Sequence, residues 1–140
     1  MTVHDDYQGG VTSIIRFSPD YPLDALQRLD DFSHLIVTWH FHLASPDDVA
    51  FHARSPRNDP RWPATGTHAH RNHRRPNQLA VSFPRLLKIH GRDLHVTDLD
   101  AVHGTPVIDL GPYFQQMGPR GPVREPEWPA EMLEKYWAER

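Results

Sequence analysis

The sequence contains no cysteine among its 140 residues. Disulfide bonds, thiolate nucleophiles and thiolate metal sites are therefore excluded. No stretch approaches 18 consecutive apolar residues, and the N-terminal MTVHDDYQGG lacks the apolar segment of a signal peptide. Neither membrane insertion nor export is indicated, and we expect a cytoplasmic protein.

A strong positive charge is also missing, because the formal net charge is -3 at pH 7. A nucleic-acid contact would therefore need a local basic patch. No Gly-x-Gly-x-x-Gly, P-loop or nucleophile-elbow pattern is found, so the familiar cofactor-binding loops are absent. The length is that of one ordinary domain, and we expect residues 1–140 to form a single one.

The dominant pattern is an alternation of apolar and polar residues, which is clearest in HLIVTWHFHL at 34–43. One face of this predicted strand carries Leu35, Val37, Trp39, Phe41 and Leu43, and the other carries His34, Ile36, Thr38, His40 and His42. Further strands are expected at 11–17, 65–70, 79–83, 85–90, 93–98 and 106–110, with a hairpin turn at 90–93. The sequence thus predicts a mostly β fold, a small antiparallel β-barrel.

Two helices are expected beside the strands. A short internal helix is predicted over 22–29, and a C-terminal helix over about 129–140. The second helix would present an apolar stripe formed by Met132, Leu133, Tyr136 and Trp137. Residues 44–66 are rich in Pro, Asp and Arg, which predicts a long exposed loop. Loops of this length inside a compact domain are usually functional or disordered.

Histidine is abundant, with 11 residues, and forms two His-x-His pairs, His40/His42 and His68/His70. On a strand each pair would place two imidazoles about 7 Å apart on one face, as in the first metal motif of cupin barrels. A cupin also needs a glutamate shortly after the first pair, where this chain has Asp47 and Asp48. We therefore expect no metal, and a metal-binding β-barrel is the alternative.

Three arginines, Arg71, Arg74 and Arg75, precede the turn-forming pair Pro76-Asn77. Guanidinium groups on a rigid loop suit bidentate binding of a carboxylate or a phosphate. A solvated surface loop is an equally common role for such a cluster. The residues alone thus predict a small β-barrel with a rim of histidine and arginine.

Three segments in order, DALQRLDDFSHLIVTWHFH, GTHAHRNHRRPNQLAVSFPRLLKIHG and DLDAVHGTPVIDLGPYF, carry a resemblance. Over about 11–114 the chain resembles the TsaA-like (TrmO/YaeB) family, whose members are β-barrel, usually dimeric methyltransferases that use S-adenosylmethionine (SAM). Their characterised activity methylates threonylcarbamoyl-adenosine beside the tRNA anticodon. The resemblance implies a SAM-dependent methyltransferase that forms a homodimer, with a non-catalytic SAM-binding module as a further alternative.

The resemblance also assigns roles to individual residues. It implies cofactor binding by Phe41, His42, Arg71, Leu79, Leu99, Asp100 and Ala101. We expect the acceptor to be bound by His40, Arg75 and Asn77, and the proton to be removed by one of four candidates, His42, His103, Asp109 and Tyr113.

The chain departs from the family pattern on the acceptor side. His103 replaces an aspartate before Gly-Thr-Pro, Gly111 replaces a lysine before Pro-Tyr, and Gln78 and Ala80 replace a proline and a glycine. Loss of the lysine weakens attraction for an anionic tRNA. We therefore slightly favour a small-molecule acceptor, carrying an amine, hydroxyl or acid group, over tRNA.

Overall fold

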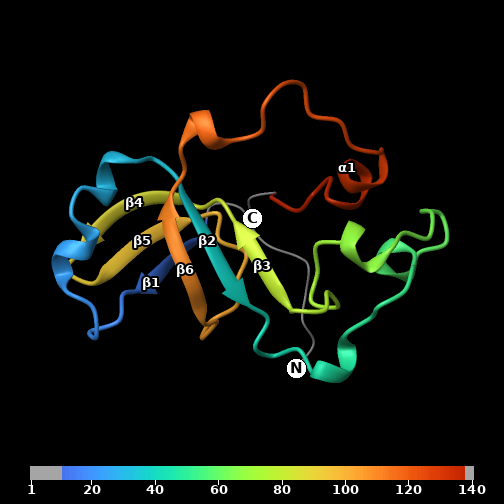
Figure 1. The fold of residues 1–140 in the computed structure, drawn as a ribbon, viewed down its shortest axis with the longest axis horizontal. Coiled ribbons are helices and arrows are strands. Elements are labelled where there is room, and N and C mark those ends of the chain that lie inside the picture. Colours follow the sequence, from blue (N-terminus) through green and yellow to red (C-terminus); the bar gives the residue numbers. More distant parts are fainter. Residues whose placement is uncertain (1–10, 138–140) are drawn as a thin grey trace.

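The structure, a computed structural model, describes residues 11–137 and is mostly β, with two antiparallel three-stranded sheets (Figure 1). One sheet has the order β1-β5-β4. Its strands are β1 (Thr12–Arg16), β4 (Arg85–His90) and β5 (Asp93–Thr97). The other sheet has the order β3-β2-β6. Its strands are β2 (Leu35–His40), β3 (Leu79–Ser82) and β6 (Val107–Pro112).

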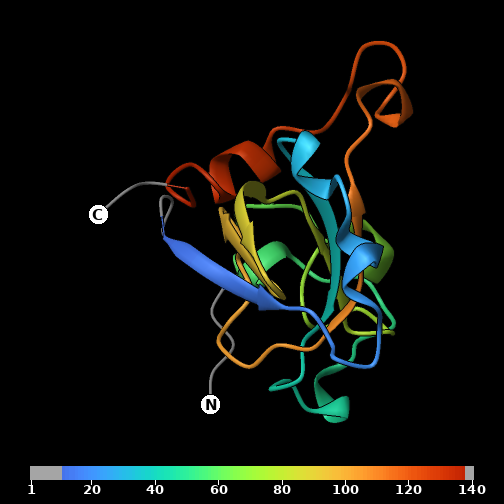
Figure 2. The same ribbon diagram turned by 90° about the vertical axis from the view of Figure 1, so that its left-hand side faces the viewer.

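Alternation of side chains explains the central strand of each sheet. Leu35, Val37 and Trp39 of β2 are buried, whereas Ile36 between them is exposed. In β5 the buried residues are Leu94 and Val96. These side chains belong to one core cluster. Figure 2 shows the two sheets, whose central strands carry them, packed beside each other. The apolar face predicted for 34–43 is confirmed as far as Trp39.

The two sheets join at one corner, where β3 runs through Phe83 and Pro84 directly into β4. The amide of Leu35 donates to Pro84 O at 3.0 Å, and the amide of Leu86 donates to Ser33 O at 2.8 Å. Pro84 is fully buried there. The mostly β prediction is confirmed, whereas closure into a complete barrel is not, because the described residues form two separate sheets.

Six of the seven predicted strands form, as does the predicted hairpin turn, in which Gly91 has φ +61°. The strand predicted at 65–70 is wrong, because Thr67–Ala69 is a single 3₁₀ turn. The His70 ring binds the carbonyls of Arg54 and Thr65 at 3.1 and 3.0 Å, so the segment folds back on its own loop. The strand pairing described in this segment is a single isolated bridge between Arg54 and Thr65.

The helices are shorter than predicted. In place of the internal helix over 22–29 there are two 3₁₀ turns, Leu23–Leu26 and Leu29–Asp31, separated by Arg28 at φ +66°. The C-terminal helix is α1 (Trp128–Met132), followed by turns, and the predicted residues 138–140 lie outside the described range. Further 3₁₀ turns span Pro46–Asp48, Pro56–Asn58 and Gln115–Met117. Among the described helices none is long and apolar enough to cross a membrane.

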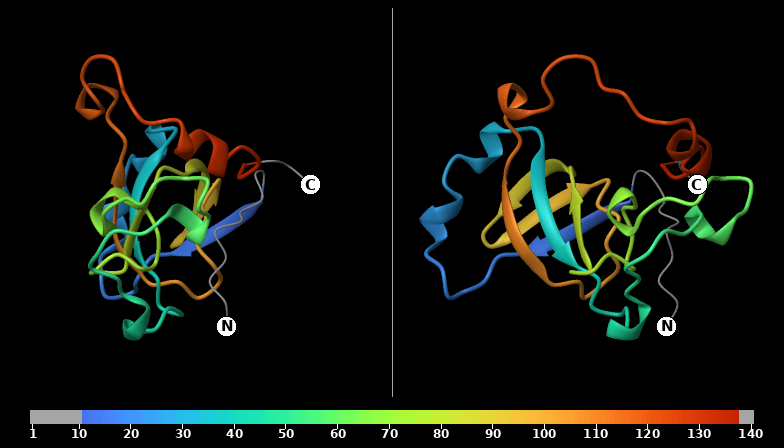
Figure 3. Two further views of the ribbon diagram at one scale, coloured as in Figure 1. Left: turned by 90° about the vertical axis from the view of Figure 1, so that its right-hand side faces the viewer. Right: turned by 45° about the vertical axis from the view of Figure 1, so that its right-hand side comes forward.

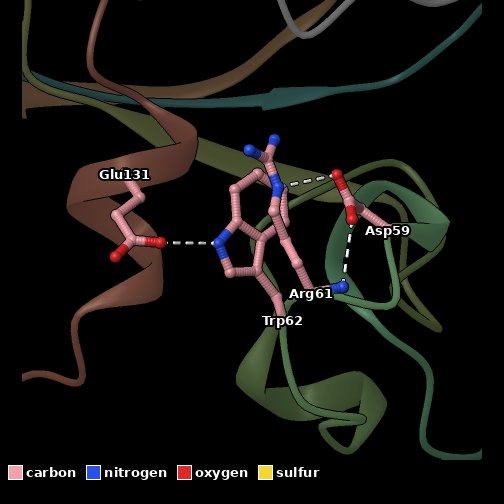
Figure 4. A network of polar contacts seen from close by, with 4 residues as sticks. All are labelled: Asp59, Arg61, Trp62 and Glu131. Carbon is pink, nitrogen blue, oxygen red and sulfur yellow. Dashed lines mark hydrogen bonds and ion pairs between the residues drawn. The ribbon is translucent and has the colours of Figure 1, made fainter.

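Residues 44–78 form a lobe beside the sheets, and α1 lies on this arginine-rich lobe (Figures 1 and 3). The indole nitrogen of Trp62 donates to Glu131 Oε2 at 2.8 Å, and the rings of His70 and Trp128 are 6.0 Å apart. Figure 4 shows Arg61 stacked on Trp62 and paired with Asp59 at 2.9 Å. The predicted long loop is therefore an ordered part of the fold.

Candidate functional site

A cleft opens where β2 ends, between that end and the loop that joins β5 to β6. It encloses about 270 Å³ of empty space, part of which is open to solvent. Its walls are formed by Trp39, Phe41, His42, Leu43, Asp100, Val102 and Thr105. Three of the predicted cofactor-binding residues, Phe41, His42 and Asp100, thus lie together although the sequence separates them widely.

Aromatic rings form one wall of this cleft. The centroids of Trp39 and Phe41 are 4.5 Å apart with an edge-on arrangement, and the His73 ring lies 6.1 Å from Phe41 on its other side. The backbone turns sharply here, because the amide of His42 donates to His40 O at 2.8 Å. Such a wall suits a flat ring or a cationic group, which aromatic faces attract.

Asp100 supplies the negative charge of the cleft and is held by two hydroxyl groups. Ser82 donates to its Oδ1 and Tyr136 donates to its Oδ2 at 2.7 Å. Ser82 in turn accepts a hydrogen bond of 2.9 Å from the indole nitrogen of Trp39. Tyr136 was predicted only as part of an apolar stripe, and its hydroxyl contact with Asp100 has no signal in the sequence.

His42 stands at the mouth of the cleft. Its Nδ1 is buried and has no hydrogen-bond partner among the described residues. Its Nε2 lies 3.7 Å from the position that a Cβ would take on Gly104, whose φ is +83°. The ring is therefore packed against the loop that carries His103, and its Nδ1 can still donate or accept a hydrogen bond.

The other four predicted cofactor residues do not line the cleft. Leu99 belongs to the buried core and Ala101 packs against it, so both flank Asp100 in the loop. Leu79 pairs with His40 at the end of β2. Arg71 Nη2 donates to Val81 O of the edge strand β3 at 2.6 Å.

The residues predicted for the acceptor and for proton transfer are spread over both ends of the sheet. His40 lies on the outer face, because it alternates with buried Trp39, and Asp109 pairs with Thr38 on that same face. His103 is exposed in the loop beside the cleft. Tyr113 donates its amide to His34 O, which places it at the opposite end of β2. The structure thus does not bring these four residues together in one chain.

Arginines of the arginine-rich lobe hold its loops together by hydrogen bonds and also give it positive charge. Arg75 donates to the carbonyls of His68 and His70, at 3.2 and 2.7 Å, and so fixes the 3₁₀ turn. Arg54 donates to Thr67 and to Asn72, both at 3.0 Å. Burial and, to a lesser extent, the neighbouring Arg74 lower the pKa of Arg54 below its usual value. Two cations are thus held side by side, which favours binding of an anion.

Gln78 is a residue that the sequence marked only as a departure from the family pattern. Its buried side-chain amide donates to Ser45 O and His73 O, at 2.9 and 3.0 Å. The backbone carbonyl of Gln78 accepts a hydrogen bond from the backbone amide of Phe41 at 3.0 Å, and the φ of Gln78 is +50°. Gln78 therefore joins the arginine-rich lobe to the aromatic wall of the cleft. Asn77 beside it is exposed in the same turn.

The histidine pairs do not assemble into a metal site. Within residues 11–137 no group of three or more His, Asp or Glu side chains is placed to hold a metal ion. His70 is buried and bonded to two carbonyls, while His68 is exposed. Nothing in the described structure supports the metal-binding alternative.

Comparison with known proteins gives one consistent family. The sequence profile of the tRNA-methyltransferase O N-terminal domain matches residues 5–118. A tRNA (adenine(37)-N6)-methyltransferase of Homo sapiens is 30% identical over 105 residues, which are 75% of this chain and 23% of the human protein. A probable S-adenosyl-L-methionine-binding protein of Methanothermobacter thermautotrophicus is 35% identical over 109 residues, which are 78% of this chain and 74% of that protein.

The fold comparison agrees with the sequence comparison. A crystal structure of TrmO from Pseudomonas aeruginosa superposes with a TM-score of 0.63 at 25% identity, covering 81% of this chain and 46% of the other. The chain also spans 59% of a related probable S-adenosyl-L-methionine-binding protein of Pyrococcus abyssi. Several relatives are therefore considerably longer than the matched region.

Proposed function

The chain belongs to the tRNA-methyltransferase O N-terminal domain family, and we propose that it is a methyltransferase that binds SAM in the cleft at the end of β2. One observation carries this proposal. Phe41, His42 and Asp100, which the family resemblance assigns to SAM, lie together on a single cleft. The chemistry of the cleft fits, because an aromatic wall facing a carboxylate suits a ligand with a flat base and a cationic sulfonium.

The size of the cleft bears on assembly. Part of its empty space of about 270 Å³ is open to solvent, so the walls of one chain leave a bound ligand partly uncovered. One cleft would therefore cover only part of SAM. We propose a homodimer in which a second copy covers the rest, as the family resemblance also implies.

An apolar surface for this second copy exists on the outer face of the β3-β2-β6 sheet. Ile36 and Val81 lie on it with about a third of their surface exposed, and Phe83 and Ile108 are about half exposed or more. The apolar stripe predicted for the C-terminal helix offers a smaller surface, because the Tyr136 hydroxyl bonds to Asp100 and only Leu133 and Trp137 are exposed. Several exposed apolar side chains on one sheet face are typical of subunit contacts.

The reaction that we propose is transfer of a methyl group, which SAM supplies in activated form. The residues of the cleft have to hold the donor and the acceptor in line, and a nearby group has to take up the proton that the acceptor loses. Of the four candidates, His42 is in the cleft and His103 lies beside it. Asp109 and Tyr113 could contribute only from the outer face or from a second copy.

For the acceptor we propose tRNA, with a small molecule as the second candidate. The sequence slightly favours a small acceptor because the net charge is -3 and Gly111 stands where the family pattern has a lysine. In the structure Arg71, Arg74 and Arg75 lie outside the lining of the cleft. They share the lobe with Arg54, whose lowered pKa reflects burial and the neighbouring Arg74. A cationic lobe beside the cleft suits a polyanion.

Two measurements test the proposal in turn. Calorimetry with SAM should show one site per chain at micromolar strength, and no heat with SAM or its demethylated product would remove the function altogether. Labelled SAM is then incubated with tRNA that lacks the methyl group. Label at the adenosine beside the anticodon supports tRNA as acceptor, whereas tight SAM binding without label in tRNA supports a small molecule.

A further inference from the structure

Tyr136 lies outside the matched family domain, which ends at residue 118, yet its hydroxyl bonds to Asp100, which lines the cleft. It donates to Asp100 Oδ2 at 2.7 Å across 36 residues of sequence. The segment that carries it is anchored elsewhere by Glu131, which accepts from Trp62, and by Trp128, which packs on His70. The C-terminal segment of this chain therefore contributes a side chain to the candidate cofactor site.

The contacts of Asp100 define what this side chain does. An ionised carboxylate accepts hydrogen bonds only, with about four lone-pair directions on its two oxygens. Ser82 uses one direction on Oδ1, and Tyr136 uses one on Oδ2. Ser82 is itself buried and oriented by the indole of Trp39. The remaining lone pairs are available to a ligand in the cleft.

Orientation is the property that Tyr136 adds. Rotation about the terminal torsion of an aspartate is broad, so one hydroxyl partner leaves the plane of the carboxylate poorly defined. Two donors, one on each oxygen, fix that plane. Ser82 comes from β3 and Tyr136 from the C-terminal segment, so the two parts of the chain hold Asp100 from different directions.

We propose that Tyr136 is a positioning residue, which holds the Asp100 carboxylate in the orientation that binds SAM. This inference rests on the proposed function, because it assigns Asp100 to the same cofactor site. It gives the C-terminal segment a role in ligand binding that the family domain alone does not supply.

The test compares SAM affinity in four forms of the full chain: wild type, Tyr136→Phe, Asp100→Asn and the double variant. Tyr136→Phe keeps the ring and removes only the hydroxyl. The ligand loses the orientation of Asp100 and not the carboxylate itself, so SAM binding should weaken about three- to tenfold, the net value of one ordinary hydrogen bond. If Tyr136 acts through Asp100, its substitution should have no further effect in the Asp100→Asn background.

Tyr21→Phe is the matched control, because Tyr21 is an exposed tyrosine whose ring packs on Phe17, away from the cleft. It should bind SAM like the wild type. Melting temperatures of all variants show whether a loss of affinity is only a loss of folding.

Two results overturn the inference while the proposed function stands. One is wild-type SAM affinity in Tyr136→Phe. The other is a Tyr136→Phe loss that persists in full on top of Asp100→Asn, which would mean that the hydroxyl acts by another route. Absence of SAM binding by the wild type would instead overturn both the inference and the proposed function.

Discussion

The indole nitrogen of Trp62 donates a 2.8 Å hydrogen bond to the carboxylate of Glu131, joining the arginine-rich lobe to α1. Glu131→Ala removes the acceptor and leaves the indole N–H of a buried tryptophan without a partner. We expect a loss of about 1–3 kcal/mol in the free energy of unfolding. Thermal and urea unfolding measure it. Glu134→Ala, an exposed glutamate one turn on, is the control and should change stability little.

Substitutions of Phe41 and Arg71 test two different contacts with SAM. Phe41 lines the cleft and Arg71 lies on the edge of β3. Phe41→Ala should weaken SAM binding at least tenfold, since truncating an aromatic contact costs about 1.4 kcal/mol or more. Arg71→Ala should match this loss if its guanidinium reaches the methionine carboxylate of SAM. Calorimetry with SAM measures the affinity of both variants. An unchanged affinity in Phe41→Ala would contradict the cleft as the binding site.

Arg74 tests the acceptor. Its guanidinium has no hydrogen-bond or ion-pair partner among the described residues, and it lies beside Arg54. Arg74→Gln should weaken tRNA binding and reduce its salt dependence by about one unit of the slope of log K against log salt. SAM affinity should not change. Arg16→Gln, on the distant strand β1, serves as the control. Equal salt slopes for wild type and Arg74→Gln would argue against a phosphate contact at this position.

Two substitutions distinguish the possible dimer surfaces. Phe83→Glu places a charge on the outer face of the β3-β2-β6 sheet, and Trp137→Glu places one beside α1. We expect light scattering to report a wild-type dimer that Phe83→Glu weakens, because burying an unpaired charge in an interface is costly. Dissociation by Trp137→Glu alone would assign the contact to the C-terminal segment. A wild-type monomer at micromolar concentration would contradict dimerisation.

Chelation tests the histidines. His40 and His42 lack a third ligand in the described structure, so purified protein should carry well under one equivalent of transition metal. Its melting temperature should stay unchanged in a chelator. Metal analysis of the protein before and after dialysis provides the measurement, and stoichiometric zinc, iron or nickel would favour the metal-binding alternative.

The strands were predictable from the sequence because burial imposes a period of two on Leu35, Val37 and Trp39. The failure at 65–70 has a specific cause, since His70 and Thr67 bind groups of the same lobe instead of pairing with a strand. No local pattern records such contacts.

The same reason limits prediction of the site. Phe41, His42 and Asp100 came from motif resemblance, but the contacts that hold Asp100 join β3 and the C-terminal segment. Gln78 illustrates the opposite case. It was visible as a departure from a proline, and only the two carbonyls that its amide binds explain it.

The corner at Pro84 makes the two sheets a single mechanical unit. One continuous segment supplies β3 to one sheet and β4 to the other, and the amides of Leu35 and Leu86 are bonded across it. The sheets cannot separate without breaking these two hydrogen bonds, so local opening of one alone is disfavoured. Amide hydrogens of β2 and β5, although they belong to different sheets, should therefore show the same opening free energy in hydrogen exchange, that of global unfolding.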